Sequence, residues 1–220
     1  MSEYNITVQA GKSTRLLTAG KYCDRDIVVT AEGGGGEDQL SSLLNGSITS
    51  IHSNVDDVVG YACRGITSLV SVELPEAVSI GTYAFYGCSG ITALNIPKVT
   101  TLGTYAFYGC NKIAEVRLPL AESIPASCFY QCESLKKADL GAAKSISSSG
   151  FAYCSKLDVL ILRRTDAVVT LNSSGFSGAN FDGFVYVPAA LVESYKTATN
   201  WTAHASRIRA IEDYPEICGN

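Results

Sequence analysis

The chain is poor in charged residues: 17% of its positions are Asp, Glu, Lys or Arg, against about 25% in typical soluble domains. It has 17 basic and 21 acidic residues, which gives a net charge of −4. Because phosphate binding depends on clustered Lys and Arg, we do not expect nucleic acid as a partner. No run approaches the roughly 18 consecutive apolar residues of a membrane span, so we expect no membrane insertion.

Residues that carry chemistry are also scarce. His52 and His204 are the two histidines, and the eight cysteines form no C-x-x-C pair, so we predict no metal site. A catalytic Cys or Ser needs a positioned base, and neither histidine lies near the repeated cysteines in sequence. The segment AGKST at 10–14 is not a phosphate loop, because Ile6 stands where that motif needs glycine. We therefore predict no enzymatic activity and no cofactor.

What the sequence does contain is an internal repeat of 22 residues. The octet GTYAFYGC at 81–88 recurs at 103–110, and related segments follow at 126–132 and 148–154. Cysteines keep the same step at Cys88, Cys110, Cys132 and Cys154. A further unit follows an insertion of three residues within 163–171. Self-similarity at such a period is typical of a solenoid, in which each unit is stable only when stacked on its neighbours.

Each unit contains an apolar-x-apolar stretch, the period of a β-strand. Proline follows four of these strands, at Pro75, Pro97, Pro119 and Pro188, and proline cannot continue a ladder. The Ala-Phe segment that follows is too short for a full helix and predicts a turn or a short helical piece. The predicted fold is a repeat solenoid with parallel strands on one face and short helical turns on the other.

The pattern I-G-x-x-A-F-x-G-C-x-x-L-x-x-L-x-I-P over about 58–188 resembles the leucine-rich repeats of the BspA-like type. The segment 185–211 resembles the cap that closes such solenoids. The resemblance implies binding or adhesion rather than catalysis, in a bacterial surface or phage-associated protein. The N-terminal sequence MSEYNITVQAGKST has no basic region followed by an apolar run, so we expect no Sec signal peptide. A virion or intracellular location is then expected, and a cell-surface location would need another export route.

The expected domain organisation has five parts. They are a small β module at 1–32, a Gly-rich linker at 33–39, an N-terminal cap at 40–57, six repeats at 58–188 and a C-terminal cap at 189–220. The β module resembles small modules of phage tail-associated proteins, and the alternative is an appendage with no partner. In the C-terminal cap, apolar residues at helical spacing predict a helix that begins near Pro188.

The alternation of the strands predicts two columns of outward side chains. One column is Ser71, Ala93, Glu115, Lys137, Val159 and Phe184, and the other is Glu73, Asn95, Arg117, Asp139, Ile161 and Tyr186. Glu115 is expected to pair with Lys137, and Arg117 with Asp139, either to stabilise the sheet or to bind a partner. Val159, Ile161, Phe184 and Tyr186 predict an exposed apolar patch that binds a partner, unless the C-terminal segment covers them.

Two further columns follow the repeat. Tyr86, Tyr108 and Tyr130 recur at one position of the turn, with Tyr83 and Tyr105 close by. Tyrosines suit a binding surface, although a stacked ladder that stiffens the convex side is the simpler interpretation. The repeated cysteines are expected to be free thiols that fill one small buried slot in successive coils, with disulfides or metal binding as weaker alternatives.

The predicted function is a non-catalytic interaction module that binds a protein or a glycan through the solenoid surface, with a phage virion or tail as one setting. The alternative is a structural spacer or scaffold without a specific ligand. Burial of Phe184 and Tyr186 by the C-terminal segment would favour the spacer.

Overall fold

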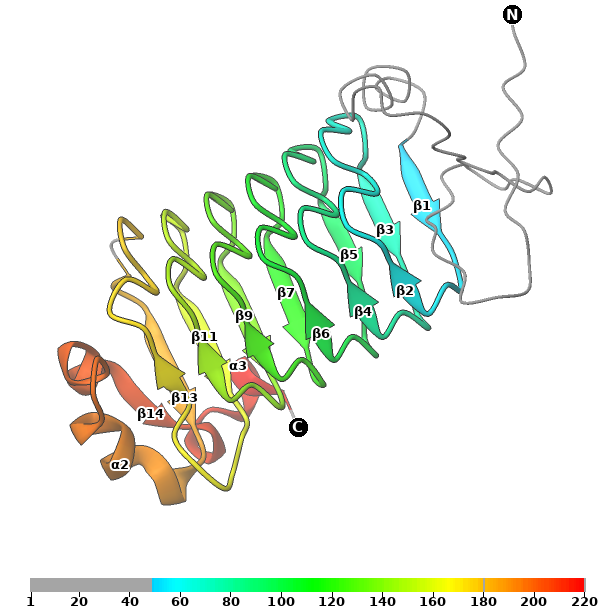
Figure 1. Ribbon diagram of the computed structural model, residues 1–220. Helices are drawn as coiled ribbons and strands as arrows, with labels where there is room; N and C mark the ends of the chain where they lie inside the picture. Colours follow the sequence, from blue (N-terminus) through cyan, green and yellow to red (C-terminus); the bar gives the residue numbers. More distant parts are fainter. Residues whose placement is uncertain (1–48, 180, 220) are drawn as a thin grey trace, which may run out of the picture.

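The computed structural model describes residues 49–179 and 181–219, which form a solenoid of about seven coils stacked in a row (Figure 1). The predicted solenoid is therefore confirmed. The predicted β module at 1–32, the linker at 33–39 and residues 40–48 of the predicted N-terminal cap lie outside the described residues.

The first strand of each coil belongs to a row of parallel strands that we call the strand face. Its members are β1 (Ser50–His52), β3 (Ser71–Glu73), β5 (Ala93–Asn95), β7 (Glu115–Leu118), β9 (Lys137–Leu140), β11 (Val159–Leu162) and β13 (Phe184–Val187). β14 (Ile208–Ala210) pairs in parallel with β13 and extends this row at its C-terminal end. The repeat-like register begins at β1, because Ile51 pairs with Val72.

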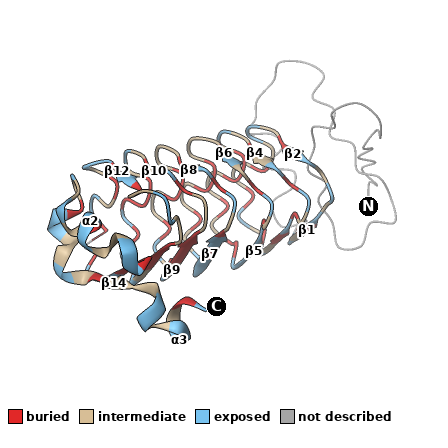
Figure 2. Cartoon of the chain, turned by 90° about the horizontal axis from the view of Figure 1, so that it is seen from below, coloured by how far each residue is buried: buried red, intermediate tan, exposed pale blue. Residues whose placement is uncertain are grey.

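A second, shorter strand in each coil lies on the opposite side of the core (Figure 2). These strands are β2 (Asp57–Val58), β4 (Ser79–Ile80), β6 (Thr101–Leu102), β8 (Ser123–Ile124), β10 (Ser145–Ile146) and β12 (Thr170–Leu171). Our sequence analysis did not predict this row, because a strand of two residues is too short to show alternation. The Ala-Phe segments that follow these strands are turns, which is the first of the two predicted possibilities.

The register of both rows follows the repeat. Val116 lies opposite Ala138, 22 residues later, whereas Leu160 lies opposite Val185, 25 residues later. The predicted insertion of three residues is thus absorbed between β11 and β12, and the strand pairing continues past it. The edge of each coil that joins its second strand to the next coil is called the turn edge (residues 59–70, 81–92, 103–114, 125–136, 147–158 and 172–183).

The core is a set of side-chain columns that run along the solenoid axis. Phe85, Phe107, Phe129 and Phe151 are fully buried, and their rings stack with centroids 5.3–5.4 Å apart. The cysteines at 88, 110, 132 and 154 are buried free thiols, as predicted for a shared slot. Each thiol donates to a carbonyl oxygen of the preceding coil, for example from Cys88 to Cys63 at 2.8 Å. The column therefore satisfies a backbone acceptor as well as filling space.

The turn edge has an unusual backbone. Each coil places a residue with positive φ at the same repeat position: Tyr61, Tyr83, Tyr105, Ser127 and Ser149 have φ between 53° and 64°. Side chains other than glycine are disfavoured in this left-handed region. Close contact between coils maintains the geometry. A Cβ at Gly81 or Gly103 would lie 2.3 Å from a backbone nitrogen of the preceding coil.

The C-terminal segment closes the last coil. It consists of η1 (Ala189–Leu191), α2 (Val192–Thr197), η2 (Thr202–Arg207), β14, η3 (Ile211–Asp213) and α3 (Pro215–Cys218). The helix predicted near Pro188 is present as η1 and α2, and Tyr195 and Trp201 are fully buried. The Tyr195 hydroxyl accepts from Val169 N at 2.9 Å, and Trp201 Nε1 donates to Val169 O at 2.7 Å. None of the helices formed by residues 49–179 and 181–219 has the length and apolar character of a membrane span.

Candidate interaction surfaces

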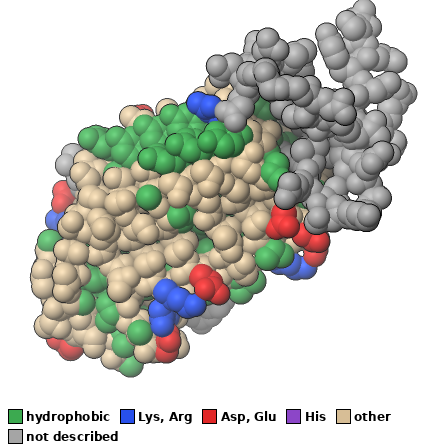
Figure 3. Space-filling view, in the orientation of Figure 1, with side chains coloured by type: hydrophobic (Ala, Val, Ile, Leu, Met, Phe, Trp, Pro, Cys, Tyr) green, Lys and Arg blue, Asp and Glu red, His purple; other side chains and the backbone are tan. Residues whose placement is uncertain are grey.

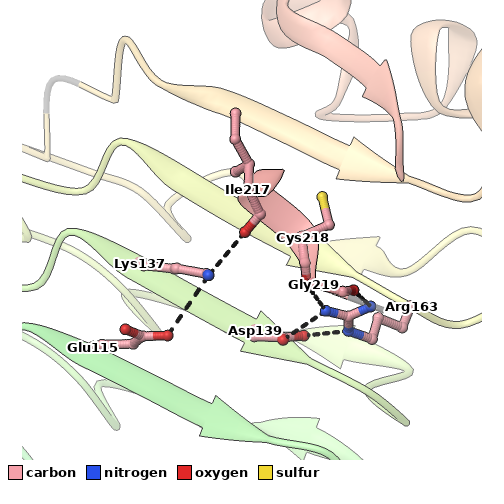
Figure 4. A network of polar contacts seen from close by, with 7 residues as sticks. All are labelled: Glu115, Lys137, Asp139, Arg163, Ile217, Cys218 and Gly219. Carbon is pink, nitrogen blue, oxygen red and sulfur yellow. Dashed lines mark hydrogen bonds and ion pairs between the residues drawn. The ribbon is translucent and has the colours of Figure 1, made fainter. Parts of the chain in front are cut away.

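The C-terminal segment covers one half of the strand face. α3 and the residues around it lie across β9 and β11 (Figure 4). Lys137 Nζ donates to the carbonyl oxygen of Ile217 at 2.9 Å. Arg163 donates to the carbonyl oxygens of Cys218 and Gly219. Two basic side chains of the repeats thus bind backbone carbonyls of the end of the chain.

Arg163 has a second role beneath this segment. Its Nε and Nη2 donate to the two carboxylate oxygens of Asp139 at 2.7 and 2.9 Å. The Asp139 side chain is 8% exposed, so the bidentate pair is largely removed from water. The hydrogen bonds from Arg163 to Asp139 raise the pKa of the guanidinium above its usual value. Our sequence analysis did not single out Arg163, because it lies in the insertion and outside the repeat columns.

The predicted charge pairs are present in one of two cases. Glu115 and Lys137 face each other on β7 and β9, with Lys137 Nζ 3.7 Å from Glu115 Oε1. Arg117 and Asp139 are neighbours in register, but Arg163 holds the Asp139 carboxylate. The prediction of an Arg117–Asp139 pair is therefore wrong, because a guanidinium from the insertion reaches the carboxylate in bidentate geometry.

The predicted exposed patch is largely buried. Ile161 and Tyr186 are 0% and 3% exposed and form a small cluster with Cys218. Val159 is half-buried and packs on the same cluster, which Ile211, Tyr214 and Ile217 also cover. Phe184 stays 39% exposed beneath the guanidinium of Arg209, whose Cζ lies 4.8 Å from the ring centroid. The expected exposure of Ile161 and Tyr186 is wrong, and the alternative that the C-terminal segment covers them is confirmed.

The other half of the strand face is open. Ala93 and Asn95 on β5 and Glu115 and Arg117 on β7 are exposed. They border a shallow groove of about 380 Å³ that continues to Glu73 on β3. His52 Nδ1 lies 2.8 Å from Glu73 Oε2 at the N-terminal end of this surface. These side chains vary in charge and size, and no apolar anchor stands out among them.

The turn edge carries the largest group of partly exposed aromatic side chains among the described residues. They form two columns: Tyr61, Tyr83 and Tyr105 in the first, and Tyr86, Tyr108 and Tyr130 in the second. Within each column the rings stack with centroids 4.6–5.0 Å apart. Figure 3 shows hydrophobic side chains, a class that includes tyrosine, gathered in one band along the upper edge of the view.

The two columns contact each other and one cation. The Tyr83 and Tyr86 ring centroids are 5.4 Å apart. Arg64 Cζ lies 5.3–6.0 Å from the centroids of Tyr61, Tyr83 and Tyr86, within the range of cation–π interactions. We call these seven residues the tyrosine surface. The second column was predicted from sequence, and the stacked ladder predicted as its simpler interpretation is present.

The hydroxyl groups of this surface stay protonated in neutral solution. Desolvation and the neighbouring tyrosines raise the pKa of Tyr83 and of Tyr108 above its usual value. Desolvation and Tyr153 raise that of Tyr130. A neutral phenol donates and accepts hydrogen bonds. The surface therefore presents ring edges and neutral hydroxyl groups, because the ring faces lie against one another.

The thiols do not form a reactive centre. Burial raises the pKa of the Cys88 thiol to about 12, and it raises those of Cys63, Cys110 and Cys132 well above 9.0. A protonated buried thiol is a poor nucleophile. Within residues 49–179 and 181–219, no group of three or more His, Cys, Asp or Glu is placed to hold a metal ion.

Comparison with known proteins agrees with the solenoid. Residues 42–158 match the model of the BspA type leucine-rich repeat region, in six copies. A leucine-rich repeat protein from Bacteroides ovatus is 20% identical, with a TM-score of 0.50 over 77% of this chain and 45% of that chain. The Treponema pallidum leucine-rich repeat protein is 23% identical, with a TM-score of 0.49 over 69% of this chain and 76% of that one. The search of curated proteins gave no match.

The chain spans less than half of the Bacteroides ovatus protein, and the likeness to that structure shows the fold alone. The family match rests on more, because it covers over half of the chain and repeats in register with the observed coils. Members of leucine-rich repeat families generally serve as protein-interaction or scaffold modules. The chain belongs to the BspA-type leucine-rich repeat family.

Proposed function

We propose that this protein is a protein-binding module whose recognition site is the tyrosine surface. The observation that carries the proposal is the occupancy of the left-handed positions of the turn edge. Tyr61, Tyr83 and Tyr105 occupy three of them, while Ser127 and Ser149 occupy the next two with the same backbone conformation. The fold therefore does not need tyrosine at this position.

Neither the backbone nor the core favours tyrosine at these positions. A bulky side chain at positive φ is disfavoured, and strain of this kind costs of order 1–3 kcal/mol per residue. Tyr61 is 40% exposed and Tyr83 and Tyr105 are partly exposed, so burial repays only part of that cost. Residues kept despite such a cost point to a role in binding.

The exposed chemistry fits a protein better than a glycan. Sugars pack on the open faces of aromatic rings, but each inner ring of the two columns has its faces covered by its neighbours. Ring edges and neutral hydroxyl groups remain, and these suit backbone amides and apolar side chains. Tyrosine is enriched at protein interfaces for this reason, since it offers large contact area for two side-chain torsions.

A spacer without a ligand is the second candidate, because Ile161 and Tyr186 lie beneath the C-terminal segment. Phe184 remains partly exposed. Binding through the strand-face residues Glu115, Arg117, Lys137 and Asp139 stays a prediction, as do a phage or bacterial-surface setting and a glycan ligand at the strand face.

The test is selection of a displayed random-peptide library on the full chain. The structure offers a matched variant, Tyr83→Ser with Tyr105→Ser, because serine already occupies the equivalent positions of later coils. Peptides enriched on the wild type should bind the variant at least tenfold more weakly. Leu120→Ser removes an exposed apolar side chain outside the turn edge and should leave binding unchanged. Equal binding to the double variant would overturn the proposed site, and failure to enrich any peptide would favour the spacer.

A further inference from the structure

The C-terminal end of the turn edge differs from the tyrosine surface and contains a groove of about 580 Å³. The groove lies between the turn of the last coil and the start of η2. It is lined by two asparagines, five small residues, three serine or threonine hydroxyl groups more than any tyrosine position would supply, two phenylalanines and a histidine: Leu171, Asn172, Ser173, Ser174, Phe176, Ser177, Gly178, Phe181, Asn200, Thr202, Ala203 and His204.

We propose that this groove binds a carbohydrate without formal charge. The proposal goes beyond the protein-binding function and concerns a different part of the surface. Two features carry it: the lining contains no Asp, Glu, Lys or Arg, and it is rich in hydroxyl and amide groups. A charged ligand would find no opposite charge there, whereas a ligand with many hydroxyl groups would find donors and acceptors together.

The two asparagines are held in place by hydrogen bonds that use one end of each amide. Asn172 Oδ1 accepts from Ser174 N at 3.1 Å and from Ser174 Oγ at 2.9 Å. Asn200 Nδ2 donates to Leu171 O at 2.7 Å. Within the described part of the chain, Asn172 Nδ2 and Asn200 Oδ1 have no protein partner. One amide thus offers a donor and the other an acceptor, each on an oriented side chain.

His204 adds a polar group on an aromatic floor. Its ring meets Phe176 and Phe181 edge-on, with centroids 5.7 and 5.6 Å apart. His204 Nδ1 is buried and has no hydrogen-bond partner among the described residues. Burial and the nearby Arg207 lower the pKa of this imidazole, so it is neutral at pH 7 and can accept or donate. Arg207 itself is paired with Asp182 at 2.7 Å.

The groove exists because the last coil departs from the repeat. Ser177 occupies the position of Tyr86, Tyr108 and Tyr130 in earlier coils, and Gly178 follows it. A Cβ at Gly178 would lie 2.7 Å from the ring of Tyr153, so that tyrosine forms the wall nearest the tyrosine surface. A tyrosine at position 177 would project from the same turn and fill the space.

The test is a glycan array probed with the labelled full chain, with uncharged, sialylated and sulfated glycans on one slide. Wild-type protein should bind uncharged glycans and no acidic class in preference to them. Ser177→Tyr and Asn172→Ser introduce residues that the repeat already uses at equivalent positions, and each should weaken binding about tenfold or more at unchanged thermal stability. His204→Phe should do the same while keeping the ring packing.

The tyrosine variant separates this proposal from the protein-binding one. Tyr83→Ser with Tyr105→Ser should leave glycan binding unchanged, and Ser177→Tyr should leave peptide binding unchanged. Absence of any glycan signal, a preference for acidic glycans, or equal binding by wild type, Ser177→Tyr and Asn172→Ser would each overturn the carbohydrate site without affecting the tyrosine surface.

Discussion

The two halves of the turn edge share one backbone and differ in their side chains. At the left-handed position, φ is 57° and 60° for Tyr83 and Tyr105 and 53° and 56° for Ser127 and Ser149. At the position of the second column, Tyr130 is followed in later coils by Ala152 and Ser177. The buried columns beneath do not change, since Phe107 and Phe151 occupy equivalent sites. The fold thus constrains the core and the backbone of this edge but leaves the outward side chains to function.

The largest effect is expected in the shared core, where the two halves should respond alike. Phe107→Ala and Phe151→Ala each remove a fully buried ring from the stacked column. Each should lower the free energy of unfolding by about 3–5 kcal/mol, measured by urea denaturation. A much larger loss for Phe107→Ala than for Phe151→Ala would mean that the tyrosine surface depends on the core beneath it.

The strand face beside the serine-rich half should be structural rather than a binding surface. Arg163→Met leaves the Asp139 carboxylate buried without its cation, and it removes the donors to Cys218 and Gly219. The expected loss is about 3 kcal/mol, with faster amide hydrogen exchange in α3. Arg164→Met is a matched control, because its partner Asp166 is exposed. Equal stability of Arg163→Met and wild type would refute this role.

Alkaline pH should destabilise both halves through the thiol column. The unfolded chain loses its thiol protons near pH 9.0, whereas burial raises the pKa of Cys88 to about 12 and that of Cys110 well above 9.0. Because the folded state holds these protons more tightly, the free energy of unfolding should fall as pH rises above 9. The slope is about 1.4 kcal/mol per pH unit for each such thiol.

Cys110→Ala tests the origin of that slope. The variant should be less stable than wild type at pH 7, and its stability should fall less steeply between pH 9 and 11, by the share of one thiol. Urea denaturation across this range measures both. An unchanged slope would assign the alkaline effect to other groups, such as Tyr83 and Tyr108, whose pKa values are also raised.

The smallest effects on stability are expected at the outward positions where the halves differ. Tyr105→Ser loses ring stacking with Tyr83, worth about 1 kcal/mol, while a smaller side chain at positive φ is less strained. The reverse change, Ser127→Tyr, should add stacking on Tyr105 and alter stability by less than about 0.5 kcal/mol. Thermal melting measures both. A loss above about 2 kcal/mol for Tyr105→Ser would show that the ladder is mainly structural.

The repeat, the strand period and the buried columns were predictable from sequence because they follow from spacing alone. Residues 22 apart occupy the same place in successive coils, so Cys88 and Cys110 had to share a slot. The columns of outward side chains were predictable in the same way. The second strand row was not, since two residues such as Ser79–Ile80 show no alternation.

The sequence by itself determined the solenoid, its register and the tyrosine columns, because a local repeat imposes a local geometry that stacking preserves. Tertiary structure decided which of the outward surfaces stay open. Ile161 and Tyr186 have the alternation of exposed residues, yet Tyr214 and Ile217 cover them. Contacts between residues so distant in the chain leave no period in the sequence. The bond from Arg163 to Cys218 and the groove between Asn172 and His204 arise in the same way, since each needs the end of the chain to fold back on the last coils.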